Sequence, residues 1–322
     1  MKVKSILFLF LFFNTIYFSN AQTDKKEKLK VLIVDGQNTH NDWPKITHII
    51  KTELEATNLF SVDVARIAFT WNGEDLLKDY PAKGSNKTQK VSEPKTDPDF
   101  SPDFKKYNAV VINLGWKTAA WPKETQTAFE AYIKEGGGLV VFHAADNCFP
   151  KWEAYNKMIG LGGWGDRNEK DGPYVYYNDA GEIVRDTTAG KGGAHGPQSE
   201  YQVVIRNKTH PITVGMPEKW LHTKDELYNS LRGPAENMEI LATAYADPKN
   251  EGTGRHEPAL MTINYGSGRI FHNIMGHSVT AVNGIGFITT MLRGTEWAAS
   301  GKVTQKLPDN LPTEKETSTK HY

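Results

Sequence analysis

The 322-residue chain contains a single cysteine, Cys148, so it cannot form an internal disulfide, and no Cys-x-x-Cys pair exists for a structural zinc site. It has no excess of charge, because 38 Lys and Arg residues balance 38 Asp and Glu residues. This neutrality argues against a nucleic-acid-binding protein, which needs a basic excess to displace counterions from phosphate. The chain also lacks Gly-x-Gly-x-x-Gly, Walker and Gly-x-Ser-x-Gly motifs, so neither nucleotide binding nor serine-hydrolase chemistry has support.

Only the N-terminus carries a markedly apolar run, and no other segment is apolar for long enough to span a bilayer. Two lysines precede the apolar stretch Ile6–Phe13, and small residues follow in Ser19–Ala21. This pattern is typical of a secretory signal peptide over residues 1–21. A membrane anchor is disfavoured because the apolar stretch is short and interrupted by Asn14. We therefore expect a periplasmic or secreted mature protein without a membrane span, beginning with a linker at residues 22–28.

The composition is that of a folded protein, with 39% hydrophobic, 24% charged and 11% aromatic residues. Short apolar runs alternate with amphipathic stretches in the first half of the chain, which predicts a parallel sheet with right-handed helical crossovers. We expect one domain over residues 29–300, a polar surface insertion at 79–105 and a flexible tail at 301–322. The predicted elements of this half are strands at Lys30–Asp35, Ser61–Arg66, Ala109–Leu114 and Leu139–His143, and helices after Pro44 and over Pro122–Glu135.

The second half contains further strand patterns, and its last two strands are joined by Gly266-Ser267-Gly268 as a hairpin. The segment His222–Tyr228 has the composition of a solvated helix start, where acidic residues complement the helix dipole. The predicted elements of this half are strands at Glu200–Arg206, Met238–Ala244, Ala259–Tyr265 and Arg269–Asn273, and helices at Trp152–Ile159 and Gly284–Ala299.

Histidines and acidic residues collect where predicted strands end. In an open parallel sheet, ligands bind beyond the carboxyl ends of the strands, so these side chains are expected to share one crevice. We predict His143 and His277 as an acid–base pair, because imidazoles exchange protons near neutral pH, with His40, Asp225 and Glu226 orienting them or the substrate. The competing interpretation is that a histidine at a strand end is a satisfied core side chain.

Several aromatic residues occupy loops and loop edges, where flat rings suit stacking on sugar faces, although filling the core would explain them equally. Arg255 or Arg167 is a candidate partner for a substrate carboxylate, against the simpler interpretation of surface solvation. The sequence predicts no organic cofactor. A divalent metal is compatible with the scattered histidines and acids, but no His-Glu-x-x-His spacing supports one. The predicted substrate-binding residues are Trp43, Trp116, Asn147, Trp164, Tyr228 and Arg255.

The segments KVLIVDGQNTH, AVVINLGW, GGGLVVFHAAD, HPITVGMP, DELYN and GRIFHNIMGH resemble the ThuA-like (trehalose-utilisation) family, from Leu29 to Ala299. The resemblance implies a flavodoxin-like parallel sheet of the class I glutamine amidotransferase type, with helices on both faces and extra hairpin strands. In the amidotransferases a cysteine nucleophile follows the strand that here ends at His143, so amidotransferase chemistry is not expected. His277 is similar in position to their catalytic histidine. The family is associated with sugar metabolism, including keto-sugar pathways and polysaccharide-degradation clusters.

Export, loop aromatics and paired imidazoles together favour a carbohydrate-active dehydratase or lyase. The expected substrate is an acidic oligosaccharide with a uronic acid at its non-reducing end, where a base removes H5 and an acid protonates the departing 4-hydroxyl. Two alternatives stay open at this point: an isomerase or hydrolase of 3-keto-sugars, and a glycan-binding protein without turnover. No nucleic-acid partner is expected, and the sequence leaves the oligomeric state open.

Overall fold

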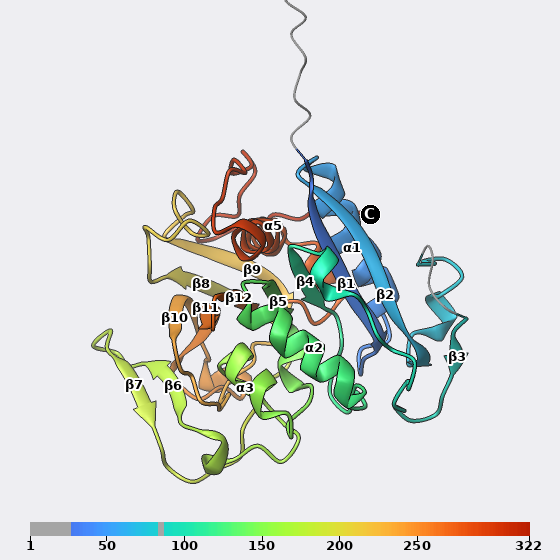
Figure 1. The fold of residues 1–322 in the computed structure, drawn as a ribbon. Coiled ribbons are helices and arrows are strands. Elements are labelled where there is room, and N and C mark those ends of the chain that lie inside the picture. The colour runs from blue at the N-terminus through green and yellow to red at the C-terminus, as the bar shows by residue number, and fades with distance from the viewer. Residues whose placement is uncertain (1–26, 83–86) are drawn as a thin grey trace, which may run out of the picture.

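The computed structural model describes residues 27–82 and 87–322; the predicted signal peptide and most of the predicted linker lie outside the described residues. One mixed sheet forms the centre of the molecule (Figure 1). The central strands of its parallel half are buried and rich in β-branched residues, as expected where helices cover both faces, whereas the edge strand β3 (Gln89–Lys90) is polar and exposed. In spatial order the strands of this half are β3, β2 (Phe60–Trp71), β1 (Leu29–Gln37), β4 (Ala109–Ile112), β5 (Gly138–Phe142) and β12 (Gly268–Asn273).

The antiparallel half continues the sheet from β12. It consists, in spatial order, of β11 (His256–Tyr265), β10 (Met238–Tyr245), β8 (Ser199–Ile205) and β9 (Lys219–Asp225), and the hairpin β6 (Tyr174–Tyr177) and β7 (Ile183–Asp186) pairs with β11. Although three strands separate β9 from β12, the Asp225 carboxylate accepts a hydrogen bond from the Gly276 amide, 2.8 Å away. The sheet therefore curls until the end of β9 reaches the loop that follows β12.

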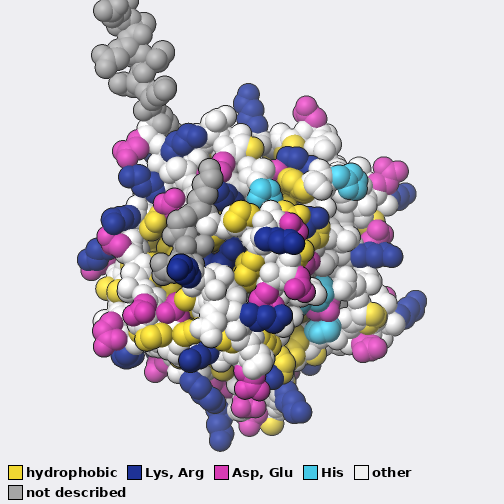
Figure 2. Space-filling view, turned by 90° about the vertical axis from the view of Figure 1, so that its right-hand side faces the viewer, with side chains coloured by type: hydrophobic (Ala, Val, Ile, Leu, Met, Phe, Trp, Pro, Cys, Tyr) yellow, Lys and Arg dark blue, Asp and Glu magenta, His cyan; other side chains and the backbone are white. Residues whose placement is uncertain are grey.

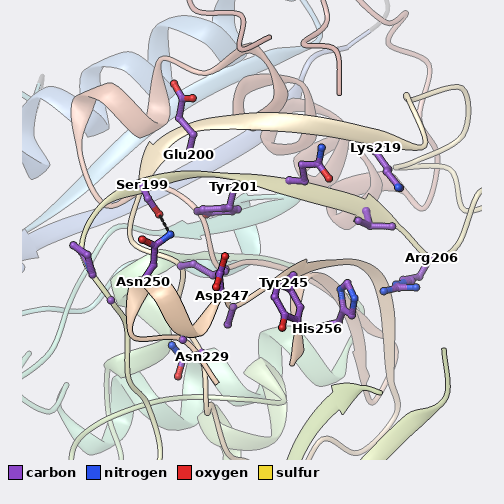
Figure 3. A pocket seen from close by; sticks show the side chains of 17 residues that line it. Ser199, Glu200, Tyr201, Arg206, Lys219, Asn229, Tyr245, Asp247, Asn250 and His256 are labelled. Atoms are coloured by element: carbon purple, nitrogen blue, oxygen red, sulfur yellow. Dashed lines mark hydrogen bonds between the residues drawn. The ribbon is translucent and has the colours of Figure 1, made fainter. Parts of the chain in front are cut away.

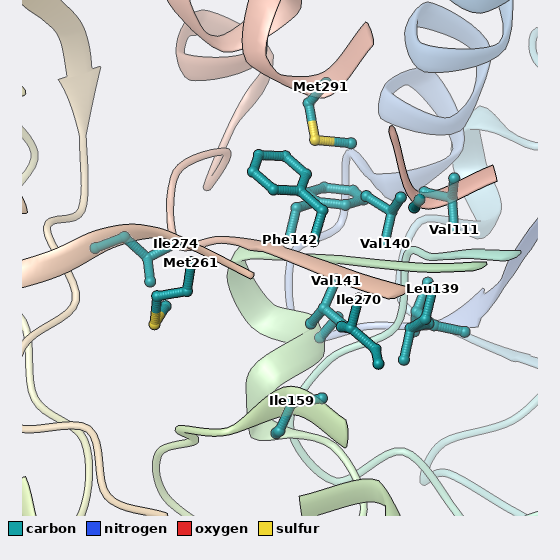
Figure 4. Packing of buried hydrophobic residues seen from close by; sticks show 14 of the residues in the cluster. Val111, Leu139, Val140, Val141, Phe142, Ile159, Met261, Ile270, Ile274 and Met291 are labelled. Carbon is teal, nitrogen blue, oxygen red and sulfur yellow. The ribbon is translucent and has the colours of Figure 1, made fainter. Parts of the chain in front are cut away.

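Helices cover both faces of the parallel half (Figure 1). On one face lie α1 (Trp43–Ala56) and α5 (Ile285–Ser300), joined by the short α4 (Val279–Val282), and on the other lie α2 (Lys123–Lys134) and α3 (Glu153–Ile159). Successive side chains of β5 point to opposite faces of the sheet and so contact both helix layers. Val140 and Phe142 point toward Met291 of α5, whereas Val141 points toward Ile159 of α3 (Figure 4).

The predicted fold class is confirmed: the structure is an α/β fold with a mainly parallel sheet, helices on both faces and additional hairpin strands. Every predicted strand and helix of the alternating half is present within a few residues of its predicted bounds. Among the described residues, no helix is long and apolar enough to cross a bilayer. On the face drawn in Figure 2, cationic and anionic side chains are interspersed, so neither sign gathers into a broad patch there.

The predicted polar surface insertion at 79–105 is mostly exposed over its described residues, but its second half sends three side chains, Asp97, Phe100 and Phe104, into the core. Phe100 and Phe104 are buried, with ring centroids 5.1 and 6.0 Å from that of Trp121. The buried Asp97 carboxylate accepts a hydrogen bond from the Ala68 amide at 2.9 Å. These two phenylalanines sit among polar neighbours in the sequence, so composition alone hid their burial.

The tail at 301–322, predicted to be flexible, is held against β9 and α5. The Leu221 amide donates to the Thr313 carbonyl and the Ile285 amide to the Ser318 carbonyl, each at 2.8 Å. These backbone bonds occupy donors of an edge strand and of a helix start, positions that otherwise lack partners within the fold. The tail therefore forms a strap over this side of the molecule.

Replacing Arg66 by Leu is expected to destabilise the protein by about 3–5 kcal/mol, because it leaves a buried carboxylate without its cation. Arg66 donates two hydrogen bonds of 2.8 Å to Asp35, which also accepts from Thr47 at 2.9 Å. Urea denaturation followed by circular dichroism measures the change. The control is Lys105→Ala, which breaks an exposed pair with Glu135 and should cost less than about 1 kcal/mol. Equal, small effects of both changes would contradict the importance of the buried pair.

Candidate metal centre

Three histidines meet at the carboxyl ends of three strands. His40 follows β1, His143 follows β5 and His277 follows β12. The ring centroid of His40 lies 5.1 Å from that of His143 and 4.3 Å from that of His277, and the last two rings are 5.3 Å apart. The structure thus brings together three imidazoles that lie far apart in the chain, as parallel-sheet topology predicts. The predicted acid–base roles of His143 and His277 stay a prediction.

Glu226 supplies a carboxylate to the same place from the end of β9. Its Oε2 atom lies 2.9 Å from His277 Nδ1 and 4.0 Å from His143 Nε2. The neighbouring Asp225 points away, into the protein. Its two oxygens accept hydrogen bonds from the amides of Glu226, Gly276 and His277 at 2.8–3.0 Å and contact His222 Nε2 at 2.9 Å. Asp225 therefore positions Glu226 and His277 and does not point toward the space between the three imidazoles.

The backbone of His143 is unusual, with φ at +41°, a left-handed conformation that is uncommon for a residue with a side chain. It begins the short 3₁₀ helix His143–Asn147 directly after β5. The Nδ1 atom lies 3.0 Å from the Ile274 carbonyl oxygen, which can only accept, so Nδ1 carries the proton. The Nε2 lone pair then faces Glu226, 4.0 Å away, and Nε2 is buried without a hydrogen-bond partner among the described residues. Such an orphan atom calls for a ligand.

Two of the imidazoles are held neutral by their surroundings. Burial, and then the neighbouring His277, lower the pKa of His40 to about 4. Burial and the nearby His40 lower the pKa of His143 well below its ordinary value. Burial alone would lower the pKa of His277 as well, but the adjacent Glu226 carboxylate raises it. Neutral imidazole is the form that binds metal ions, and a carboxylate beside it adds compensating negative charge.

These four side chains have the composition and spacing of a metal site. His40, His143, His277 and Glu226 each offer one ligand atom, and the four atoms lie within 4.8 Å of one another. Two ligands on opposite sides of an ion with bonds of about 2.1 Å are about 4.2 Å apart, so small side-chain adjustments would close the site. Three nitrogen donors and one oxygen donor suit a transition-metal ion better than Ca²⁺ or Mg²⁺. The hydrogen bond from His143 to a backbone carbonyl is also the usual outer-shell partner of a ligating histidine.

The centre lies beside a cavity of about 460 Å³, which His40 and His277 line together with small polar side chains. On the other side of Glu226 stand Trp164, His195 and Tyr228. The Tyr228 ring centroid is 4.1 Å from that of His143 and 4.7 Å from that of Trp164, and Asn147 donates to the Tyr228 hydroxyl at 3.3 Å. The structure therefore places Asn147, Trp164 and Tyr228, three of the predicted substrate-binding residues, around the centre.

The other three predicted substrate-binding residues are engaged elsewhere. Trp43 is fully buried and donates through Nε1 to the Asn72 carbonyl, so it is a core residue at the start of α1. Arg255 packs over the Tyr176 ring and pairs with Asp186, which ties it to the β6–β7 hairpin. Trp116 is exposed and has only the Lys117 ammonium over its ring. None of these contacts reaches the histidines.

Arg167 and Cys148 both have structural roles. Arg167, the alternative carboxylate partner, is buried and donates to the carbonyls of Gly163 and Cys148, so it braces the loop after α3. Cys148 is buried, and burial raises the pKa of its thiol to about 12, as expected for a structural cysteine.

His195 is the residue at this site that sequence reasoning missed. Its Nε2 atom lies 3.6 Å from Glu226 Oε2, and its ring centroid lies 5.8 Å from that of Trp164. It comes from the glycine-rich loop before β8, and the only signal in the sequence was a histidine among glycines, which loop geometry explains equally well. The antiparallel pairing of Ala194 with Asn229 brings this loop alongside Glu226 and Tyr228.

The structure has a strained residue directly after β5 and a histidine after the strand next to it, an arrangement that fits the α/β fold of the class I glutamine amidotransferase type implied by the sequence resemblance. Here the strained residue is His143 rather than a nucleophile. The chain belongs to the ThuA (trehalose utilisation) family, whose model matches residues 30–298.

Solved structures agree with this assignment. The chain is 41% identical to a ThuA-like protein of Parabacteroides merdae ATCC 43184, over 91% of this chain and 98% of that one, with a TM-score of 0.79. A ThuA-like protein of Bacteroides uniformis ATCC 8492 is 18% identical over 91% of this chain and 97% of that one, with a TM-score of 0.51, and so shares the fold. No curated protein shows significant similarity to the chain.

Proposed function

We propose that this protein is an exported carbohydrate-active lyase that holds a divalent transition-metal ion through His40, His143, His277 and Glu226. The observation that carries the proposal is the buried, unpartnered Nε2 of His143 at the point where the four ligand atoms converge. Export rests on residues 1–21 alone, and the choice of a sugar substrate rests on the rings and polar side chains around the centre.

The proposed reaction removes water from a uronic acid at the non-reducing end of an oligosaccharide. His195 takes H5 as a proton: the C5–H bond breaks, its electron pair forms the C4=C5 double bond and the C4–O bond breaks. The departing hydroxide then takes a proton from the protonated imidazole and leaves as water, which returns His195 to its starting form. Negative charge develops on the carboxylate while H5 is removed, and a bound cation stabilises such charge. An ion held by His40, His143, His277 and Glu226 would supply this positive charge beside the substrate carboxylate.

His195 is the side chain that this proposal assigns to proton transfer. It is not one of the four ligands, its side chain is 37% exposed, and its Nε2 faces Glu226 at 3.6 Å, so it borders the space that a substrate would occupy. The half-buried Trp164 flanks it with a ring suited to a sugar face, whereas Tyr228 is buried between His143 and Trp164. In this arrangement His143 and His277 bind the ion instead of forming the acid–base pair predicted from the sequence.

The test is an assay on a panel of oligosaccharides ending in a uronic acid, with ultraviolet absorbance reporting the conjugated product and mass spectrometry reporting loss of water. Chelation should abolish turnover, and adding back Mn²⁺, Ni²⁺ or Zn²⁺ should restore it. Turnover that survives complete metal removal would contradict the metal role and favour the acid–base pair His143 and His277. Isomerisation or hydrolysis of a 3-keto-sugar, or thermal stabilisation by glycans without any product, would contradict the lyase.

A further inference from the structure

A second cavity, of about 480 Å³, lies on the outer face of the antiparallel half of the sheet (Figure 3). Its floor is formed by β8 and by the ends of β10 and β11, and its rim by the segments 196–199 and 246–252. The volume falls within the range of about 300–1,000 Å³ typical of small-ligand sites. None of the four proposed metal ligands lines it.

The two cavities share a wall. Along the segment 226–229, Glu226 and Tyr228 face the metal centre, whereas Leu227 and Asn229 line the second cavity. This alternation is that of an extended chain, whose successive side chains point to opposite sides. The neighbouring loop repeats the arrangement, with His195 toward the centre and Gly196 and Pro197 toward the second cavity. The wall is one residue thick at both places.

The lining combines an exposed ring with hydroxyl and amide groups. Tyr245 is 41% exposed, and its ring centroid lies 5.2 Å from that of His256. Ser199 and Asn250 face each other across the cavity mouth, 3.5 Å apart, and Gln202 adds a second amide to the lining. An exposed ring beside several amides and hydroxyls is a combination suited to a sugar, which offers one apolar face and a perimeter of hydroxyl groups.

Charge is distributed unevenly within this cavity. Figure 3 shows Arg206 and Lys219 at one end, Glu200 toward the other and Asp247 near the middle. The Lys219 ammonium forms an exposed pair with Glu314 at 3.7 Å, so Arg206 is the cation of this lining that is left for a ligand. The Arg206 Nε donates to Thr243 Oγ1 at 2.8 Å, and its guanidinium lies over the Tyr177 ring, which together fix its position. Among the described residues, its two Nη atoms have no hydrogen-bond partner, so a fixed pair of donors is left for an anionic group.

We propose that this second cavity binds an anionic saccharide, with a ring stacked on Tyr245 and a carboxylate or sulfate at Arg206. The choice of a saccharide as the ligand rests on the proposed function. The cavity and its lining residues are independent of that proposal. Such a site would retain an acidic polysaccharide chain next to the metal centre, so the reacting end would be present at a higher local concentration.

The experiment is isothermal titration calorimetry of metal-stripped protein with tri-galacturonate, and with cellotriose as the neutral ligand. We expect tri-galacturonate to bind more tightly than cellotriose. Tyr245→Ala should weaken its binding about tenfold, through lost stacking. Arg206→Gln should weaken it by a similar factor and remove the preference for the acidic ligand. Lys208→Gln, which removes a nearby cation paired with Glu218 outside the cavity lining, should leave binding unchanged.

Equal binding of both trisaccharides, or wild-type affinity in the Tyr245 and Arg206 variants, would overturn this proposal, provided that circular dichroism shows the variants to be folded. A His143→Ala protein separates the two sites. Retained, Tyr245-dependent binding in that protein supports a second site, and it would do so even if the lyase assay finds no turnover. Loss of binding on His143→Ala would instead place the ligand at the histidines and overturn the second site.

Discussion

The His143→Ala variant is expected to fold and to lose both the bound metal ion and turnover. The substitution removes the imidazole whose Nε2 has no partner within the described protein, and only one hydrogen bond, to the Ile274 carbonyl, is lost with it. Stability should therefore change by only about 1–3 kcal/mol. Metal affinity should fall by more than about 100-fold, because even outer-shell changes cost 10–100-fold. Turnover should fall at least about a hundredfold with the ion.

Elemental analysis of the purified variant and the absorbance assay measure these two losses separately. The matched control is His48→Ala, which removes an exposed histidine on α1 whose ring centroid lies 5.2 Å from that of Tyr80. Its metal content and turnover should equal those of the wild type. A His143→Ala protein that retains a full equivalent of metal, or wild-type turnover, would show that His143 is not part of the centre.

The Asp225→Ala variant is expected to be among the most destabilising single changes in the chain, by about 3–5 kcal/mol. Three backbone amides, those of Glu226, Gly276 and His277, lose their acceptor inside the protein, and His222 loses its carboxylate. Each unsatisfied buried donor costs about 1–3 kcal/mol, partly recovered by relaxation. Two of these three amides belong to the proposed metal ligands Glu226 and His277, so metal affinity should also fall about 10–100-fold.

Chemical denaturation gives the stability change, and calorimetric titration with Zn²⁺ gives the affinity change. Asp225→Asn serves as the control, because it keeps the size and one acceptor oxygen and should cost less in both measurements. If Asp225→Ala binds Zn²⁺ like the wild type, the carboxylate does not position Glu226 and His277, and the link between β9 and the loop after β12 is not needed for the centre.

The parallel half of the fold could be predicted because its signals are local. The runs Val31–Val34 and Leu139–Phe142 are apolar, as strands buried on both faces must be, and the helix after Pro44 has an apolar face with a clear period. The topology of the sheet then predicted the position of the site. Parallel strands end at one edge of the sheet, so His40, His143 and His277 were expected together and are found together.

The remaining parts depend on contacts that no local pattern reports. The segment containing Asp225 resembles a helix start because its acids are adjacent, whereas the structure has it at the end of β9, an edge strand that the curl of the sheet brings to the centre. The separate roles of Asp225 and Glu226 follow from which side of that chain each one occupies. Trp43 was assigned to a sugar site because it borders a polar loop, but it is the first residue of α1 and its side chain is completely buried.

The most direct test of the metal centre is anomalous X-ray diffraction from crystals of the protein grown with Zn²⁺ and measured on both sides of the zinc edge. The account predicts one strong anomalous peak about 2.0–2.2 Å from nitrogen atoms of His40, His143 and His277 and from an oxygen atom of Glu226. A pocket that holds only water between the three rings, with any zinc bound elsewhere on the surface, would contradict it.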